Sequence, residues 1–308
     1  MTTQSFEHTG RPEGFIAPDL RPSGLVLQPR ELATDTWALM ANQPPKDNNG
    51  LIVGERAALV IDSGVVPAVG SQILRLAAEL TERPVRYLAY TTFHGDHTFG
   101  ASAFDDAVTV ISSIGNRHAM ADLSAEKKAR EESMYGDPAL DDVVTWRRPD
   151  VTFDQYAEVD LGGRSVQLWC FGPGNGPGDT IVYDPASRTA WTGNFLMPAG
   201  VMPMLLIGDP DRYRISVDAM ADTLDIDRIV PGHGWIADGA AALAALQGYL
   251  RQLADDVRAV LASDEPFEAA LDRLAPPPTK GTDLPATMAA SLHRLNFAAA
   301  FRTLSADR

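Results

Sequence analysis

The stretch YTTFHGDHTFG at residues 90–100 decides the fold. It follows the apolar run Val85 to Tyr90, which is typical of a buried strand, so the histidines lie in a loop at a strand end. Loops held by a rigid sheet are where catalytic and binding groups tend to lie. His94, Asp96 and His97 offer ligands suited to zinc or iron, whereas calcium and magnesium prefer oxygen ligands alone. The stretch therefore predicts a transition-metal loop.

A second histidine loop strengthens this interpretation. One His-x-Asp-His cluster is only moderately specific, because a hydrogen-bonded surface loop is the simpler alternative. However, His233 lies in the sequence VPGHG at residues 230–234, and this loop also follows a short apolar strand, residues 228–230. Both loops thus occupy the strand-end positions that suit a functional site.

The order of elements along the chain predicts the fold class. Apolar runs separated by turn residues predict strands at 51–54, 57–62, 85–90, 108–111, 153–161, 165–171, 180–183, 189–192 and 228–230. Apolar residues at helical spacing predict helices at 69–80, 212–224 and 238–262, with more helix after Glu265. This order predicts an α/β protein in which two mixed β-sheets pack face to face with helices outside, an αβ/βα sandwich.

The chain is predicted to form one domain behind an N-terminal arm. Prolines discourage regular structure in residues 1–30, which we interpret as an extended arm, and regular structure is expected from about Trp37. Residues 31–308 form the single domain, with a C-terminal helical segment over about 237–308. Residues 117–135 read as a charged helix, and we interpret their charges, including Glu126 and Arg130, as a solvated face.

Five segments in order resemble the motifs of the metallo-β-lactamase superfamily, over about residues 48–236. The signature loop of that family usually reads Thr-His-x-His-x-Asp-His, with a glycine shortly after. The similar segments here are residues 58–64 (an early strand and turn), 90–100 (the signature loop), 172–180 (the second metal loop), 191–196 (the loop of a bridging aspartate) and 230–234 (the last metal loop).

The departures from the family pattern fall in one half of its two-metal site. The resemblance assigns one metal to the first two histidines of the signature loop and the histidine of the second loop, which here are Thr92, His94 and Asn175. The bridging aspartate of the family is replaced by Asn194. This half keeps one imidazole and otherwise neutral groups, so we expect that metal position to be empty.

The other half of the site is retained. The resemblance assigns the second metal to Asp96, His97 and His233, all of which are present. One carboxylate and two imidazoles, with water in an open position, suit a catalytic zinc ion, and the same set suits non-haem iron(II). We therefore expect one zinc or iron ion, while a site without metal stays open as an alternative.

His94 and Asp96 are the predicted catalytic residues. His94 is left without its former partners, and a free imidazole titrates near neutrality, so it could transfer protons to or from water or substrate. The alternative is a loop histidine that is hydrogen-bonded to Asn175. If no metal binds, Asp96 with a neighbouring histidine could act as an acid/base pair. Asp62 is predicted to orient a loop imidazole rather than to act as a catalyst.

The apolar loop after Asn194 suggests the nature of the substrate. Phe195, Met197 and Met202 lie in this loop, and adaptable methionine-rich surfaces suit apolar ligands. A core segment or a dimer contact is the alternative. If the loop lines the pocket, the substrate is a small hydrophobic molecule.

Three functions are compatible with these features. The first is hydrolysis of an ester, lactone, thioester or amide by metal-activated water, as the resemblance implies. The second is a non-hydrolytic enzyme of the same fold: a lyase, a cyclase or a mononuclear iron oxygenase in specialised metabolism. The third is a ligand-binding protein without catalysis, which the retention of Asp96, His97 and His233 argues against.

The amino-acid composition makes some classes of binding partner poor candidates. The chain has 26 basic and 41 acidic residues and a formal net charge of −15, so nucleic acids and anionic membranes are poor partner candidates. The single cysteine, Cys170, excludes an intramolecular disulfide. Residues 1–30 do not read as a signal peptide, and no apolar run is long enough to span a membrane, so a cytoplasmic protein is expected. The arm and the C-terminal helices are candidates for homodimer contacts.

Overall fold

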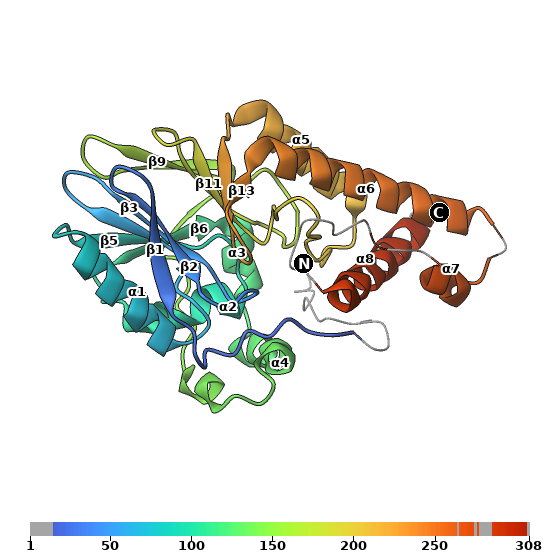
Figure 1. Ribbon diagram of the computed structural model, residues 1–308, viewed down its shortest axis with the longest axis horizontal. Helices are drawn as coiled ribbons and strands as arrows, with labels where there is room; N and C mark the ends of the chain where they lie inside the picture. The colour runs from blue at the N-terminus through green and yellow to red at the C-terminus, as the bar shows by residue number, and fades with distance from the viewer. Residues whose placement is uncertain (1–14, 264, 274–275, 277–284, 307–308) are drawn as a thin grey trace.

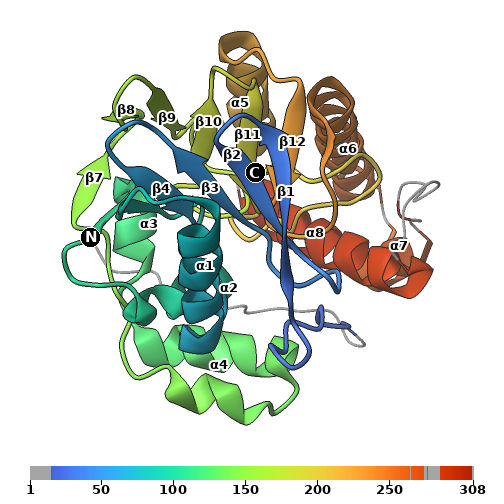
Figure 2. The ribbon, with the colours of Figure 1, turned by 60° about the vertical axis from the view of Figure 1, so that its left-hand side comes forward.

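The computed structural model describes residues 15–263, 265–273, 276 and 285–306. Two β-sheets form its centre (Figures 1 and 2). The first sheet consists of β1 (Leu27–Ala33), β2 (Thr36–Ala41), β3 (Asn49–Val53), β4 (Ala58–Ile61), β5 (Val85–Ala89), β6 (Thr109–Ser113) and β7 (Val151–Phe153), in that order. The second consists of β13 (Ala237–Asp238), β12 (Arg228–Pro231), β11 (Thr189–Gly193), β10 (Ile181–Asp184), β9 (Ser165–Trp169) and β8 (Tyr156–Asp160).

Both sheets are mixed, as predicted. Strands β1 to β4 pair antiparallel, whereas β4 to β7 pair parallel. In the second sheet only β11 and β12 are parallel among the described strands. The parallel strands β4 and β5 end at the same edge, and the loops that follow them carry Asp62 and the signature loop. This edge positions the candidate site.

Helices cover the outer faces of both sheets. They are α1 (Pro67–Leu80), α2 (Gly95–Thr98), α3 (Ile114–Ala119), α4 (Leu123–Met134), α5 (Pro210–Thr223), α6 (Gly239–Leu261), α7 (Phe267–Arg273) and α8 (Ala286–Ala306), with 3₁₀ turns at Phe99–Ala103 and Pro138–Asp142. Helices α1 to α4 belong to the first-sheet side, while α5 to α8 extend from the second-sheet side (Figure 1).

Three buried apolar clusters hold these layers together. One lies between the sheets, where residues such as Ile61 and Ile111 of the first sheet meet Leu168 and Trp191 of the second. A second cluster packs α1 onto the first sheet, and the third packs α5, α6 and α8 onto the second. The buried residues of α6 recur at spacings of three and four, as in an amphipathic helix. The four layers form the predicted αβ/βα sandwich.

Some element boundaries differ from the sequence prediction. Regular structure begins at Leu27, because β1 pairs with β2 as an edge strand, and an edge tolerates Pro29. The predicted strand at 153–161 is two strands: β7 belongs to the first sheet and β8 to the second. Asp122 caps α4 and separates it from α3, which divides the predicted helix at 117–135.

The described part of the arm crosses from the C-terminal helices to α4. The backbone N–H of Ile16 donates to Ser291 on α8, and the N–H of Leu20 donates to the carbonyl of Ser133 on α4. Residues 1–14 of the predicted arm lie outside the described residues. No helix in the described part of the chain is long and apolar enough to cross a membrane.

Candidate metal centre

The structure brings Asp96, His97 and His233 together at one edge of the sandwich. Asp96 and His97 lie in α2 after β5, and His233 follows β12 of the second sheet. One ligand atom from each residue lies within 4.8 Å of the others. The Oδ2 atom of Asp96 is 3.3 Å from Nε2 of His233 and 3.6 Å from Nε2 of His97. Loops far apart in the sequence thus present three metal-binding atoms to a common point.

The other nitrogen of each imidazole is fixed by a neighbour. His233 Nδ1 lies 2.6 Å from the carbonyl oxygen of Pro45, which can only accept a hydrogen bond, so Nδ1 carries the hydrogen. His97 Nδ1 lies 2.9 Å from Oδ2 of Asp62. His97 Nε2 is buried and has no hydrogen-bond partner among the described residues. This pattern fits a metal site, because ligating histidines usually bind a carboxylate or carbonyl through the other nitrogen.

Asp62 orients His97, as the sequence predicted. Its carboxylate also accepts hydrogen bonds from the backbone N–H and the hydroxyl of Thr91, at 2.7 and 2.6 Å. The backbone of Asp62 has a φ of 59°, in the left-handed region that aspartate tolerates better than most residues. The turn after β4 therefore holds the Asp62 carboxylate beside Nδ1 of His97.

The charges on α4 do not form the solvated face that the sequence predicted. Glu126 and Arg130 are only 7% and 4% exposed. Arg130 Nη1 donates to Oδ1 of Asp96 at 2.9 Å, and its Nε lies 3.2 Å from Oε1 of Glu126. That prediction was wrong for these two residues, because their spacing puts them on one helix face, and this face packs against the signature loop rather than water.

Neighbouring charges set the ionisation of the site. Burial opposes the ionisation of Asp96, but Arg130, His97 and His233 hold the pKa of this carboxyl well below its usual range. Burial would lower the pKa of His97, but Asp62 and Asp96 outweigh it and raise the pKa of His97 to about 10. Burial also opposes ionisation of Glu126, yet Arg130 and His94 lower its pKa.

The residues of the depleted half of the two-metal site are buried, and a hydrogen bond joins His94 to Asn175. Thr92, Asn175 and Asn194 are 0%, 1% and 8% exposed. Asn175 Nδ2 donates to the carbonyl of Met204, so its Oδ1 is free to accept from His94 Nε2 at 3.0 Å. This bond to Asn175 is the one expected of a loop histidine, the alternative to a catalytic His94. His94 Nδ1 lies 3.8 Å from Glu126 and has no hydrogen-bond partner among the described residues.

The loop of residues 203–205 accepts a hydrogen bond from Asn175 and is in turn bound by the C-terminal helices. Leu205 N–H donates to Oδ1 of Asn296 on α8 at 2.8 Å, and Asn296 Nδ2 donates to the carbonyl of Pro203. The same Nδ2 donates to the Tyr249 hydroxyl on α6 at 3.0 Å. A chain of hydrogen bonds therefore runs from α8 through the 203–205 loop to Asn175 and His94.

The three predicted substrate-binding residues are largely buried. Phe195 and Met202 are 0% and 5% exposed and belong to the apolar cluster that packs against α5 and α6. Met197 is 9% exposed. Apolar composition alone does not distinguish a core position from a pocket wall, and contact of these residues with a substrate stays a prediction.

Asp47 is a site neighbour that the sequence analysis missed. It is 1% exposed, pairs with His233 through a backbone bridge, and places Oδ1 3.6 Å from Nδ1 of His233. Burial and the charge of Asp96 raise the pKa of this carboxyl well above its usual value. The adjacent Asn48 bonds to the carbonyls of Pro231 and Gly234, so the loop before β3 supports the last histidine loop.

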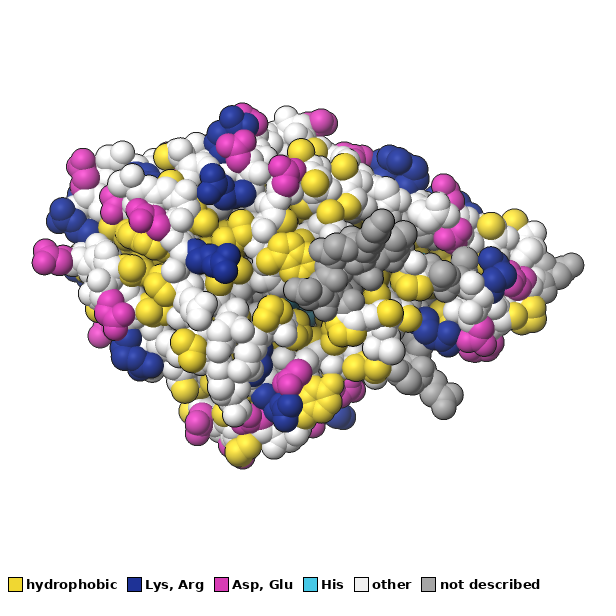
Figure 3. Space-filling model, viewed as in Figure 1, with side chains coloured by type: hydrophobic (Ala, Val, Ile, Leu, Met, Phe, Trp, Pro, Cys, Tyr) yellow, Lys and Arg dark blue, Asp and Glu magenta, His cyan; other side chains and the backbone are white. Residues whose placement is uncertain are grey.

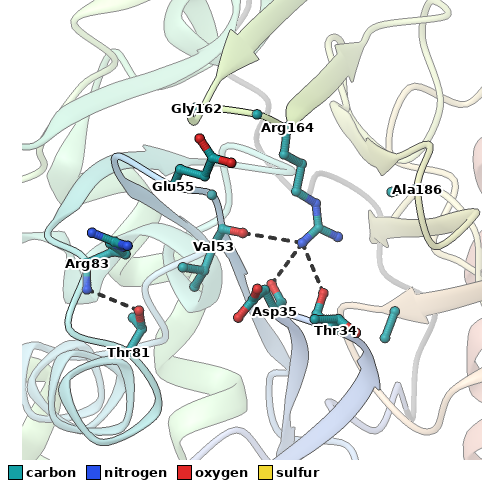
Figure 4. A pocket seen from close by; sticks show the side chains of 12 residues that line it. Thr34, Asp35, Val53, Glu55, Thr81, Arg83, Gly162, Arg164 and Ala186 are labelled. Atoms are coloured by element: carbon teal, nitrogen blue, oxygen red, sulfur yellow. Dashed lines mark hydrogen bonds between the residues drawn. The ribbon is translucent and has the colours of Figure 1, made fainter.

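A cavity of about 570 Å³ lies at the opposite end of the sandwich (Figure 4). Its walls include Gly54, Glu55 and Arg83, which precede β4 and β5, whereas the candidate metal ligands follow such strands. Arg164 in its wall donates to backbone carbonyls of Thr34, Asp35 and Val53 and pairs with Asp184. This guanidinium joins turns of the two sheets, so we assign it a structural role.

The outer surface mixes charges of both signs. In the space-filling view, Lys and Arg side chains alternate with Asp and Glu over the visible face, and almost no histidine surface appears (Figure 3). The low exposure of two candidate ligands is consistent with this view, since Asp96 and His97 are at most 1% exposed. The metal-binding atoms of Asp96 and His97 therefore lie beneath the surface, whereas the His233 side chain is 16% exposed.

Zinc uptake by the metal-free protein is expected to release about one proton near pH 7.5. The pKa of about 10 keeps His97 protonated there, and this proton must leave before Nε2 can bind zinc. Zinc affinity should therefore rise with pH up to about 10. Isothermal titration calorimetry in two buffers of different ionisation enthalpy measures the released protons. Zinc binding without proton release would contradict a protonated His97.

Residues 46–233, more than half of the chain, match the metallo-beta-lactamase superfamily. The chain belongs to this superfamily, as the fold and the histidine loops also indicate. It is 29% identical over 191 residues to the alpha subunit of 2,4-dinitroanisole O-demethylase from Nocardioides sp. (strain JS1661), covering 60% of this chain and 51% of that protein. It is 23% identical over 221 residues to a linear primary-alkylsulfatase from Pseudomonas sp. (strain ATCC 19151), covering 61% and 42%.

Solved structures show the same fold. A stereoselective inverting sec-alkylsulfatase from Pseudomonas sp. superposes with a TM-score of 0.69 at 16% identity, covering 90% of this chain and 50% of that one. A metallo-beta-lactamase from Pontibacter korlensis gives a TM-score of 0.56 at 17% identity, covering 73% and 99%. The chain spans about half the length of the curated relatives it matches.

Proposed function

We propose that this protein is a hydrolase that uses one metal ion held by Asp96, His97 and His233. The observation that carries the proposal is the convergence of one carboxylate oxygen and two imidazole nitrogens within 4.8 Å. The remaining polar atoms of these side chains are already bound by Arg130, Asp62 and Pro45. Fixed orientation of this kind is what a metal site requires of its neighbours.

A zinc ion in this set would supply an activated water at neutral pH and polarise the bond to be cleaved. The protein would contribute orientation through the fixed Asp96 carboxylate. His94 is our candidate for proton transfer, because it lies two residues before Asp96 and its Nδ1 has no hydrogen-bond partner among the described residues. Asn175 would hold the ring in place during this transfer.

We infer that the substrate is a small, uncharged apolar ester, lactone, thioester, amide or aryl ether. The first four are the bonds expected from the sequence, and the aryl ether is added because a relative is a 2,4-dinitroanisole O-demethylase subunit. The other relative is an alkylsulfatase, whose substrate is anionic. Among the described residues, the site holds the buried carboxylates of Asp62, Asp96 and Glu126 and one buried guanidinium, Arg130, which already pairs with Asp96 and Glu126. This balance favours neutral substrates over sulfate esters.

Metal analysis of the purified full chain, combined with hydrolysis assays, tests the proposal. We expect about one zinc or iron ion per chain by mass spectrometry, lost in Asp96→Ala and His233→Ala. Hydrolysis of an aryl ester or of 2,4-dinitroanisole should disappear in the same variants, and a linear alkyl sulfate should react more slowly. His118→Ala removes an exposed imidazole far from the three ligands in sequence and is the control. Metal-free protein, even after zinc and iron are added, would overturn the proposal.

A further inference from the structure

The two oxygens of Asp96 have different surroundings. Oδ2 faces the imidazole nitrogens of His97 and His233, at 3.6 and 3.3 Å. Oδ1 instead accepts a hydrogen bond from Arg130 Nη1 at 2.9 Å. One oxygen is therefore directed to the candidate metal position, while the other is held by a guanidinium on α4. A carboxylate bound in this way offers a metal a single oxygen.

Arg130 also connects Asp96 to a second buried carboxylate. Its Nε lies 3.2 Å from Oε1 of Glu126, one turn earlier on α4. The same oxygen of Glu126 accepts the backbone N–H of Gly95 at 2.8 Å. Helix α4 thus binds the signature loop at two points, the Gly95 backbone and the Asp96 side chain. The guanidinium lies at the centre of this contact.

A purely structural role would not require these charges. Glu126, Arg130 and Asp96 are at most 7% exposed, and removing charges from water costs much of what their mutual attraction returns. A buried ion pair is therefore weak evidence for stability, and apolar residues could pack α4 against the loop at no greater cost. The position of the pair, directly on a candidate metal ligand, points to a role in the site.

The buried charges balance with one divalent cation. Asp62, Asp96 and Glu126 are buried carboxylates that accept hydrogen bonds from N–H groups in the site. Asp47 and Asp179 are also buried there, but burial raises the pKa of both carboxyls, which favours their neutral form. Arg130 supplies one positive charge, and one divalent ion supplies two, so the set becomes neutral. In a two-metal site the second cation would add charge that Thr92, Asn175 and Asn194 cannot offset, because all three are neutral.

We propose that Arg130 is a positioning residue that holds Asp96 as a one-oxygen ligand and supplies the positive charge that a second metal would otherwise bring. Glu126 completes the arrangement by holding Arg130 against the signature loop. This inference rests on the proposed metal site but not on the reaction catalysed there. It concerns metal affinity and coordination, which can be measured without any substrate.

The test compares zinc affinity and the cobalt(II) absorption spectrum of the full chain with those of variants. Arg130→Gln removes the positive charge and the guanidinium N–H groups that contact Asp96 and Glu126. We expect this variant to bind zinc ~10–100-fold more weakly, as for other groups that support metal ligands. The visible bands of the cobalt(II) protein should change in intensity, because Asp96 is free to bind through both oxygens. Arg130→Lys keeps the charge and should recover most of the lost affinity, although lysine cannot hold both carboxylates as a planar fork.

Arg164→Gln is the matched control. Arg164 is also a largely buried arginine paired with an aspartate, Asp184, but it lies at the opposite end of the sandwich. This variant should lower the melting temperature and leave zinc affinity and the cobalt(II) spectrum unchanged. If Arg130→Gln behaves in the same way as this control, Arg130 is structural and the inference fails while the metal site stands. If the unmodified protein binds neither zinc nor cobalt(II), the proposed metal site itself fails.

Discussion

Gly100→Ala is expected to destabilise the protein by about 3 kcal/mol or more, which is the upper part of the range for overpacked positions. A Cβ atom at residue 100 would lie 1.9 Å from the carbonyl oxygen of Ser63 and 3.0 Å from that of Val66. Both neighbours are backbone atoms, so no side chain can rotate away. The substitution would separate the signature loop from the turn after β4, where Asp62 holds His97.

Thermal unfolding followed by circular dichroism measures this effect. A loss of 3 kcal/mol corresponds to about 5 °C in melting temperature for a chain of this size. Gly248→Ala is the matched control, because Gly248 is an exposed residue within α6 and a Cβ there meets nothing within 4 Å. That variant should be unchanged or slightly more stable, since alanine favours a helix interior by up to about 1 kcal/mol. Equal melting temperatures for both variants would show that the Ser63 contact is not rigid.

Asp62→Asn is expected to weaken zinc binding by ~10–100-fold without disrupting the fold. Asparagine has nearly the same shape and tolerates the positive φ of 59° at this position, so the backbone turn should persist. The loss is the negative charge that accepts from His97 Nδ1 at 2.9 Å and from Thr91. Without this anion the His97 ring is less firmly held and is a weaker ligand.

Competition with a chromophoric chelator measures the zinc affinity of this variant. Asp160→Asn provides the control, because Asp160 forms an exposed ion pair with Arg56, far in sequence from the metal ligands. Exposed ion pairs of this kind contribute little, so its zinc affinity and stability should match the unmodified protein. An Asp62→Asn protein that binds zinc as tightly as this control would show that Asp62 does not support the ligand.

The sequence predicted those elements whose pattern is local. Strands β3 to β6 are apolar runs between turn residues, and the structure places them within a few residues of the predicted limits. The sandwich of two mixed sheets also follows from the order of the elements. The division of residues 151–160 between the two sheets was not predicted, because both halves have the same strand pattern and only tertiary packing separates them.

The residues of the candidate site that lie in recognisable sequence motifs could be predicted. The proximity of Asp96, His97 and His233 followed from the resemblance of two loops. Arg130 could not be found in this way, since its charged helix reads as solvent-facing until the signature loop is seen to pack against it. A partial signal was available, because Glu126 and Arg130 are four residues apart and so share a face with Ser133 and Met134, which are also buried.

The hydrogen bonds around Asn175 also limit which single substitutions could create a second metal position. Asn175→His alone would remove the amide that donates to the Met204 carbonyl and accepts from His94. The neighbouring loop would still be held by Asn296, so it could not readily move aside for a larger ring. This substitution would therefore lose existing hydrogen bonds before a second metal could offset the loss. A second metal position would therefore require coordinated changes at Thr92, Asn175 and Asn194, with compensation on α8.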